Sequence, residues 1–198
     1  ERELVLDLFE DYCGARLTYN SMRIGGLPID IPSGWDRKVR AFCDVMDSKI
    51  PEYEELLTNN RIWLERTRGI GVISGEEATA LGLCGPPLRG SGVYRDVRKD
   101  EPYAAYDEFE FDVPLGTHGD TYDRYLIRLE EFRQSLFIIR QALDGLPEGP
   151  VMGKVPRLIK PKAGETYHAI ESPKGELGYF IVSDGRATNP YRLRVRPP

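Results

Sequence analysis

Several stretches of the chain place apolar side chains three or four residues apart, the spacing that gives a helix one apolar face. A serine followed three residues later by an acidic residue indicates a capped helix start, and both Ser33 with Asp36 and Ser74 with Glu77 fit this pattern. Gly14 is a suitable residue to end the first helix. The predicted helices cover residues 1–12, two segments within 31–69 that are separated at Pro51, a short segment within 73–83 and a long one from 120 to 143.

Other stretches alternate apolar and polar residues at every second position, which is typical of strands with one buried face. Residues 107–114 and residues 17–24 are each predicted to form a short strand, the latter followed by a turn at Gly25 and Gly26. The Gly- and Pro-rich stretch 82–92 is predicted to be a loop. Near the C-terminus three alternating runs predict an antiparallel meander over residues 166–172, 176–183 and 191–196.

Together these elements predict an α+β protein that is mostly helical, with a long central helix and a small antiparallel sheet near the C-terminus. Residues 1–150 are expected to form a mainly helical core, and residues 151–198 a linker and the meander of the same domain. No apolar run approaches the roughly 20 residues needed to cross a bilayer, and no signal peptide is visible. The chain is therefore expected to be soluble and not membrane-spanning.

Charge and cysteine content narrow the classes of function. The formal net charge of −5 argues against nucleic acid as the main partner. Residues 1–150 hold 28 acidic and 18 basic side chains, whereas residues 151–198 hold 4 acidic and 9 basic ones, so either the two parts face different surroundings or the surface charge is unevenly scattered. Cys13, Cys43 and Cys84 stand far apart without a CxxC motif, which argues against a local metal site and a disulfide framework.

The polar residues that open the long helix permit two interpretations. Asp120 can cap the helix, and Arg124 lies four residues from both Asp120 and Arg128. Together with Asp123 they form either a cap followed by a salt-bridged helix face, or a buried polar cluster at an interface with another subunit or at a redox site. His118 precedes this helix and could move protons or be a solvated loop residue. Neither histidine in the chain has a partner that suggests a nucleophilic triad.

Three stretches of the chain resemble one known family. Residues 14–32, 88–136 and 171–198 look like the D-subunit family of the proton-pumping NADH:quinone oxidoreductase, respiratory complex I. The RGSG, GD-x-YDRY and E-x-PKGE-x-G motifs are specific in combination, although each is weak alone.

The resemblance implies a fold related to [NiFe]-hydrogenase large subunits, from which the metal centre has been lost. Such a subunit forms one wall of a quinone cavity, and the neighbouring B-type subunit of complex I forms the other wall and holds the terminal iron–sulfur cluster. Electrons pass from this cluster to quinone, and the reduction drives proton translocation elsewhere in the complex.

The resemblance also implies which parts this chain lacks. The quinone-ligating residues are expected to precede Glu1 and the hydrogenase-like C-terminal segment to follow Pro198, so the sequence looks like a central fragment. It would then contain no catalytic residue, bind no cofactor or metal itself, and be inactive alone. Its expected partners are the other complex I subunits, especially those of the B and C types, and quinone, at the cytoplasmic side of the plasma membrane as a peripheral protein.

Three residues match family positions near the terminal cluster. Arg16 and Arg23 match arginines expected to set the electrostatics there. Many relatives carry histidine where this chain has Thr18, and threonine cannot couple reduction of the cluster to protonation.

Two other functions stay open. A hydrogen-activating [NiFe]-type hydrogenase large subunit requires two pairs of cysteines, which this chain does not contain. A non-catalytic interaction domain could dock its basic sheet on a partner or an anionic surface.

Overall fold

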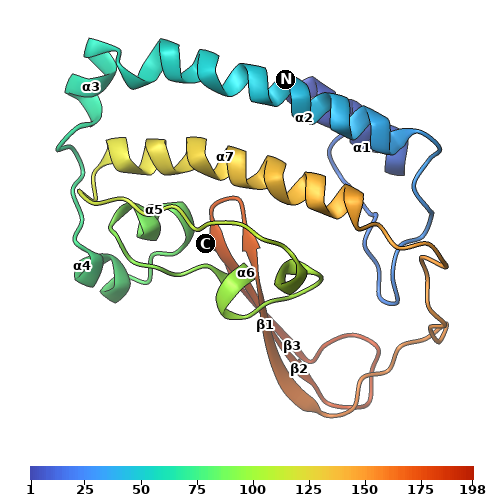
Figure 1. The fold of residues 1–198 in the computed structure, drawn as a ribbon. Helices are drawn as coiled ribbons and strands as arrows, with labels where there is room; N and C mark the ends of the chain where they lie inside the picture. Colours follow the sequence, from blue (N-terminus) through green and yellow to red (C-terminus); the bar gives the residue numbers. More distant parts are fainter. The chain divides into compact units, whose positions relative to one another are not determined.

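The computed structural model describes residues 1–198 (Figure 1). By its internal contacts the chain divides into two compact units. Unit 1 consists of Glu1–Glu52 and Ile139–Ile159, and unit 2 of Tyr53–Ile138 and Lys160–Pro198. The expected division at residue 150 stays a prediction. In chain order the elements are α1 (Arg2–Cys13), α2 (Trp35–Tyr53), the π-helical turn η1 (Glu54–Thr58), α3 (Arg61–Thr67), α4 (Gly75–Ala80), α5 (Gly85–Gly90), α6 (Val97–Asp100), the 3-10 turn η2 (Tyr106–Glu108), α7 (Thr121–Asp144), β1 (Gly164–Ser172), β2 (Gly175–Ser183) and β3 (Arg192–Arg196).

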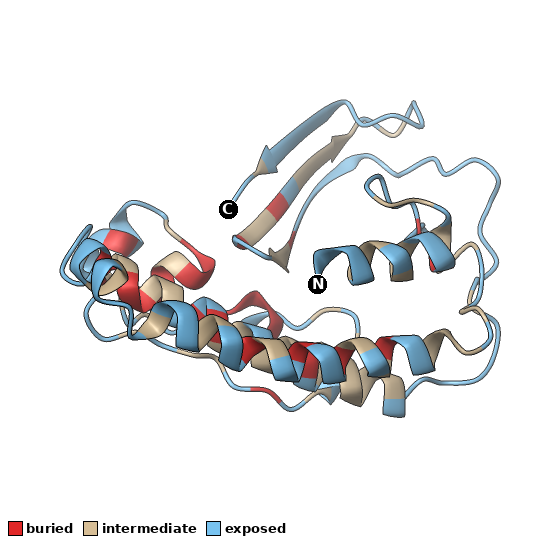
Figure 2. Ribbon diagram, turned by 90° about the horizontal axis from the view of Figure 1, so that it is seen from above, coloured by how far each residue is buried: buried red, intermediate tan, exposed pale blue.

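The mixture of helices with one antiparallel sheet confirms the predicted α+β class, whereas kinship with hydrogenase large subunits stays a prediction. In unit 1 the helix α1 ends at Gly14, whose φ of +72° is the left-handed conformation expected of a helix-ending glycine. The indole Nε1 of Trp35 donates a hydrogen bond to Leu8 O at 2.9 Å and so ties α2 to α1. Val39 and Cys43 continue the buried stripe of α2, which Figure 2 shows in red along the helix.

Unit 2 contains the predicted meander. Its strands pair in the order β1-β2-β3, all antiparallel, with Glu171 opposite Glu176 and Gly178 opposite Arg196. The helix α5 packs against β2 and α6 packs against β1, so both short helices lie on the sheet. The predicted short helix is α4, where Ser74 Oγ accepts a hydrogen bond from Glu77 N at 3.2 Å.

The structure corrects two predictions about helix boundaries. Ser33 makes no capping hydrogen bond, because a turn with Gly34 at φ +78° separates it from the helix, which begins at Trp35. Pro51 lies inside α2 and does not separate two helices. It stands close to the end of α2, where a missing N–H interrupts only the last turn. The next helix begins at Arg61, after Asn60 accepts hydrogen bonds from two backbone N–H groups of α3.

Three further predictions were wrong for tertiary reasons. The expected loop 82–92 contains α5, whose prolines occupy the first turn, where no N–H is required. Residues 107–114 form no strand, because no neighbouring strand is available and Asp112 N instead donates to the side chain of Gln134 at 2.9 Å. Residues 17–24 make only an isolated bridge between Arg23 and Gly26.

Candidate functional site

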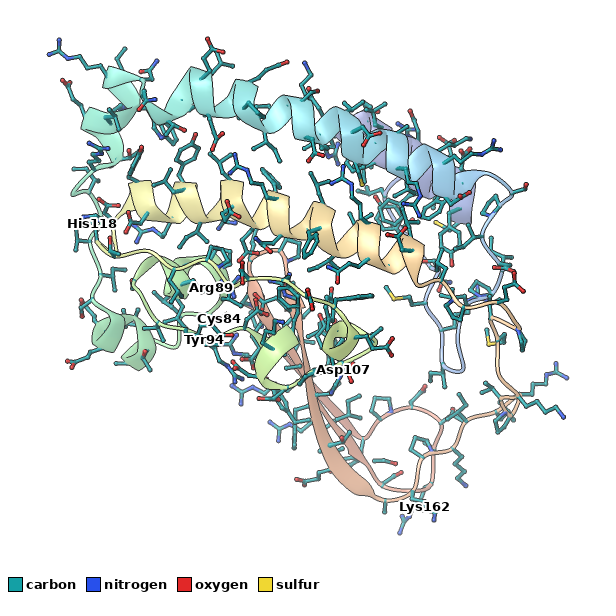
Figure 3. The ribbon with its side chains drawn as sticks, in the orientation of Figure 1. Cys84, Arg89, Tyr94, Asp107, His118 and Lys162 are labelled. Atoms are coloured by element: carbon teal, nitrogen blue, oxygen red, sulfur yellow. The ribbon has the colours of Figure 1, made fainter.

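A buried cluster of charged side chains lies at the centre of unit 2, and Figure 3 labels its arginine, Arg89. Arg89 on α5 is only 1% exposed, and Asp96, the N-cap of α6, is 0% exposed. Buried charges are costly unless they are paired and hydrogen-bonded, so each requires a partner. We call this set the Arg89 cluster; its members are Arg89, Asp96, Arg98 on α6, Glu131 on α7 and Glu171 on β1.

Arg89 joins the three carboxylates of the cluster. Its Nη2 donates to Glu131 Oε1 at 2.6 Å, and both Nη atoms lie 3.1 Å from Glu171 Oε1. Its Nη1 lies 3.4 Å from Asp96 Oδ2, while its buried Nε has no hydrogen-bond partner. Arg98 binds Asp96 through two nitrogen atoms, Nε at 2.9 Å and Nη2 at 2.6 Å. The cluster therefore connects α5, α6, α7 and β1 by charge-assisted hydrogen bonds.

Tyr103 links the same strand to the segment that follows α6. Its hydroxyl donates to Glu171 O at 3.4 Å and accepts from Glu171 N at 3.1 Å. Burial raises the pKa of Tyr103 to about 12, and the neighbouring Tyr106 adds to the rise. The phenol therefore stays neutral at physiological pH and adds no charge to the Arg89 cluster.

The Arg89 cluster was not predicted from the sequence. Its members are separated by up to 82 residues, as between Arg89 and Glu171, and no local spacing connects them. The RGSG and E-x-PKGE motifs contain Arg89 and Glu171, and they contributed only to the family resemblance. The signal available in the sequence was that each of these two motifs begins with a charged residue.

The predicted polar residues of α7 lie together in unit 2. Asp120 stands at the helix start, where its Oδ1 accepts from Asp123 N and its Oδ2 from Gly69 N, both at 2.8 Å. Asp120, Arg124 and Arg128 make no salt bridges with one another, because Arg124 donates to the backbone oxygens of Gly119 and Gly71, each at 2.8 Å. These two bonds connect the loops that contain Gly119 and Gly71 to the start of α7. Arg128 is exposed and makes no ion pair.

His118 and Asp123 form a pair at the edge of a cavity of about 830 Å³. His118 Nδ1 lies 3.3 Å from Asp123 Oδ1, and the histidine side chain is 75% exposed. Asp123 Oδ2 accepts from both Thr117 N and His118 N at 2.6 Å. Burial by itself raises the pKa of Asp123, but these backbone hydrogen bonds outweigh it, so the pKa is lowered. The carboxylate orders the loop, and the histidine is left accessible to solvent.

Asp123→Asn is expected to destabilise the chain by about 1–3 kcal/mol at neutral pH, because an amide is a weaker acceptor than the buried carboxylate for the two backbone N–H groups. The lowered pKa of Asp123 gives stability that is present above its unfolded-state pKa and lost as pH falls through the folded-state pKa. Urea unfolding at neutral and acidic pH measures both effects. Asp107→Asn, at an exposed position without a partner, is the control. Equal stability of the two variants at neutral pH contradicts this role of Asp123.

The three residues expected near the iron–sulfur cluster lie in the loop of residues 14–29 of unit 1. Arg16 turns back on α1, where its guanidinium lies 2.6 Å from each of three carboxylates, those of Glu3, Asp7 and Glu10. Hydrogen bonds to these carboxylates raise the pKa of Arg16 further above its ordinary value. Thr18 and Arg23 have exposed side chains without partners.

Large apolar side chains on the same loop are exposed. Met22 is 84% exposed, Leu17 74% and Ile24 70%. A set of large apolar side chains in water is typical of a surface that another protein covers.

The structure offers no metal site of its own. No group of three or more His, Cys, Asp or Glu side chains is arranged to hold a metal ion, and Cys13, Cys43 and Cys84 are free thiols. None of the helices combines the length and the apolar character that are required to cross a bilayer.

Comparison with known proteins gives matches over the whole chain. Residues 1–163 and 155–198 match the family described as respiratory-chain NADH dehydrogenase, 49 Kd subunit. The chain is 54% identical over 198 residues to the D 2 subunit of NADH-quinone oxidoreductase of Solibacter usitatus, and 50% identical over 198 residues to the D subunit of the Clostridium beijerinckii enzyme. These alignments cover 100% of this chain and 53% of each relative, so the chain spans about half the length of the curated relatives it matches.

Proposed function

The chain belongs to the 49 Kd subunit family of respiratory-chain NADH dehydrogenase, and from this premise we propose that it forms part of the scaffold of the quinone-site subunit of an NADH:quinone oxidoreductase. In this role it lies next to the terminal iron–sulfur cluster held by the B-type subunit. Electron transfer from that cluster to quinone is coupled to proton translocation. The chain itself contributes support and docking surfaces, and its partners are the other subunits, especially those of the B and C types.

Both cofactors of this reaction are expected outside the chain. An iron–sulfur cluster requires several converging thiolates, and the thiols of Cys13, Cys43 and Cys84 are isolated from one another. The cluster is therefore proposed on the B-type subunit, and the quinone at the interface between that subunit and the full-length relative of this chain. We place the assembly at the cytoplasmic side of the plasma membrane, as a peripheral part of the complex.

The exposed loop of residues 14–29 is the observation that carries this proposal. Met22, Leu17 and Ile24 present apolar surface that a partner can cover, and Arg23 lies between two of them with a free positive charge. The loop is the proposed docking surface for the B-type subunit. Arg23 then adds positive potential beside the cluster, whereas the charge of Arg16 is compensated by α1. Thr18 gives the cluster no titrating neighbour near neutral pH.

Met22→Asp in the full-length protein tests this proposal. Burial of an uncompensated carboxylate in an apolar interface should reduce recovery of the B-type subunit with the complex, and NADH:quinone activity with it, by about tenfold or more. Leu158→Asp is the matched control, because Leu158 is 76% exposed and lies outside the loop. Circular dichroism of the isolated chains establishes that both variants fold. Normal recovery of the B-type subunit with Met22→Asp contradicts the assigned docking surface.

A further inference from the structure

The Arg89 cluster is not electrically balanced when all its members are ionised. It contains two guanidinium groups, those of Arg89 and Arg98, and three carboxylates, which leaves a formal charge of −1. Four of the five side chains are less than a tenth exposed, and Glu131 is 18% exposed. An uncompensated charge in such surroundings is costly, and the uptake of one proton removes it.

The hydrogen bonds identify the carboxylate that can take up the proton. Asp96 accepts from Arg98 at 2.6 and 2.9 Å and also from Arg98 N, so both of its oxygens are strongly bound. Glu131 Oε1 receives the shortest bond from Arg89, at 2.6 Å. The second oxygen of Glu131 lies 3.6 Å from Arg98 Nη2, and Glu131 is 18% exposed, so water can reach it. Glu171 is only 6% exposed and all its bonds are long: Oε1 receives two of 3.1 Å, and the only donor to Oε2 is Val97 N at 3.4 Å. Oε2 of Glu171 is therefore the oxygen with room for a proton.

The other charged groups around Glu171 do not supply a missing positive charge. Glu176 on β2 is its neighbour across the ladder and adds a further carboxylate. Arg95 is bound to Asp100 and Glu101, and lies 3.8 Å from Glu176. Tyr103 contacts only the backbone of Glu171. Burial raises the pKa of Glu171, and the opposing effects of Arg89 and Arg98 do not reverse the rise.

We propose that the Arg89 cluster is a binding site for a single proton, which is held on Oε2 of Glu171. Uptake converts the Glu171 carboxylate to a carboxylic acid and changes the charge of the cluster from −1 to zero, with solvent as the source of the proton. This proposal concerns the chain alone and goes beyond the proposed function, since it requires neither quinone nor another protein. It gives the chain a buried group that binds and releases a proton inside the scaffold.

The pH dependence follows from the raised pKa of Glu171. The folded chain then binds this proton more tightly than the unfolded chain does. Its contribution to stability is present at acidic pH and is lost as pH rises through the folded-state pKa of Glu171. This direction is opposite to that of Asp123, whose pKa is lowered.

Two substitutions that each remove one carboxylate distinguish a protonated from an ionised Glu171. If Glu171 holds the proton, Glu171→Gln leaves the cluster neutral with its other ion pairs intact. Glu131→Gln instead removes a carboxylate that lies 2.6 Å from Arg89, and the positive charge left behind is compensated only if Glu171 gives up its proton. Just above the ordinary glutamate pKa, we then expect the melting temperature of Glu171→Gln to stay within about 2 °C of wild type and that of Glu131→Gln to fall by about 6 °C or more. If all three carboxylates are ionised, both variants relieve the same negative charge and shift in parallel, which overturns the proposal.

Infrared spectroscopy of the 198-residue chain provides a second readout. A buried protonated glutamate gives a carboxylic C=O band that shifts when the glutamate carboxyl carbons carry ¹³C. We expect this band to persist above the ordinary glutamate pKa in wild type and in Glu165→Gln, an exposed change on the same strand, and not in Glu171→Gln. If Glu171→Gln does not fold, the labelled wild type is sufficient, because loss of the band at the ordinary glutamate pKa overturns the proposal.

Discussion

Replacement of Arg89 by methionine is expected to destabilise unit 2 by about 3–5 kcal/mol, the cost of leaving buried charges without their partner. Arg89 is the only residue that contacts all three carboxylates of the cluster, and it is 1% exposed. Methionine replaces the unbranched stem of arginine and lacks the guanidinium, so the change removes mainly the charge and its hydrogen bonds. Because whole domains are stable by about 5–15 kcal/mol, this loss is a large share of the total.

Chemical denaturation followed by circular dichroism measures the effect. Arg192→Met is the matched control, since Arg192 lies exposed on β3 without a partner, and the substitution should change stability by no more than about 0.5 kcal/mol. The two variants remove the same functional group from the same chain, so their difference isolates the buried cluster. Unfolding of Arg89→Met at the same denaturant concentration as the control contradicts a stabilising role for the cluster.

Gly85→Ala is expected to destabilise the chain by about 3 kcal/mol. Gly85 has a φ of +63°, which costs an alanine about 1–2 kcal/mol. Its new Cβ would lie 2.3 Å from Gly175 Cα and 2.6 Å from Lys174 O, two backbone atoms of the turn between β1 and β2. Overpacking of this kind adds about 1–3 kcal/mol. Because Gly85 begins the helix that carries Arg89, the displacement also reaches the Arg89 cluster.

Gly82→Ala separates the two contributions to this effect. Gly82 has a φ of +71°, and an added Cβ there meets nothing within 4 Å. It should therefore show only the backbone cost of about 1–2 kcal/mol. Urea unfolding of both variants gives the difference, and equal losses contradict the close approach of α5 to the β1–β2 turn.

The features that the sequence predicted correctly depend on nearby residues. The apolar repeat of α7, the ending of α1 at Gly14 and the Ser74 cap of α4 are each encoded within a few residues. The meander is also local, since its strands follow one another in the sequence and each pairs with the next. Asp120 at the start of α7 belongs to the same group. Motifs scattered along the chain were sufficient to indicate the family, because their combination is specific even though each is weak.

The remaining features of the fold and of the Arg89 cluster depend on contacts between residues that are distant in the sequence. A strand requires a partner at hydrogen-bonding distance, and residues 107–114 lack one despite their alternating pattern. The helix α5 forms in a stretch rich in glycine and proline, where it packs on the sheet. Arg89 and Glu171 meet only because α5 packs on the sheet that contains β1, and burial places their charges in one environment. Sequence periodicity reports which side of an element is apolar, but it does not report which distant charges will share one buried volume.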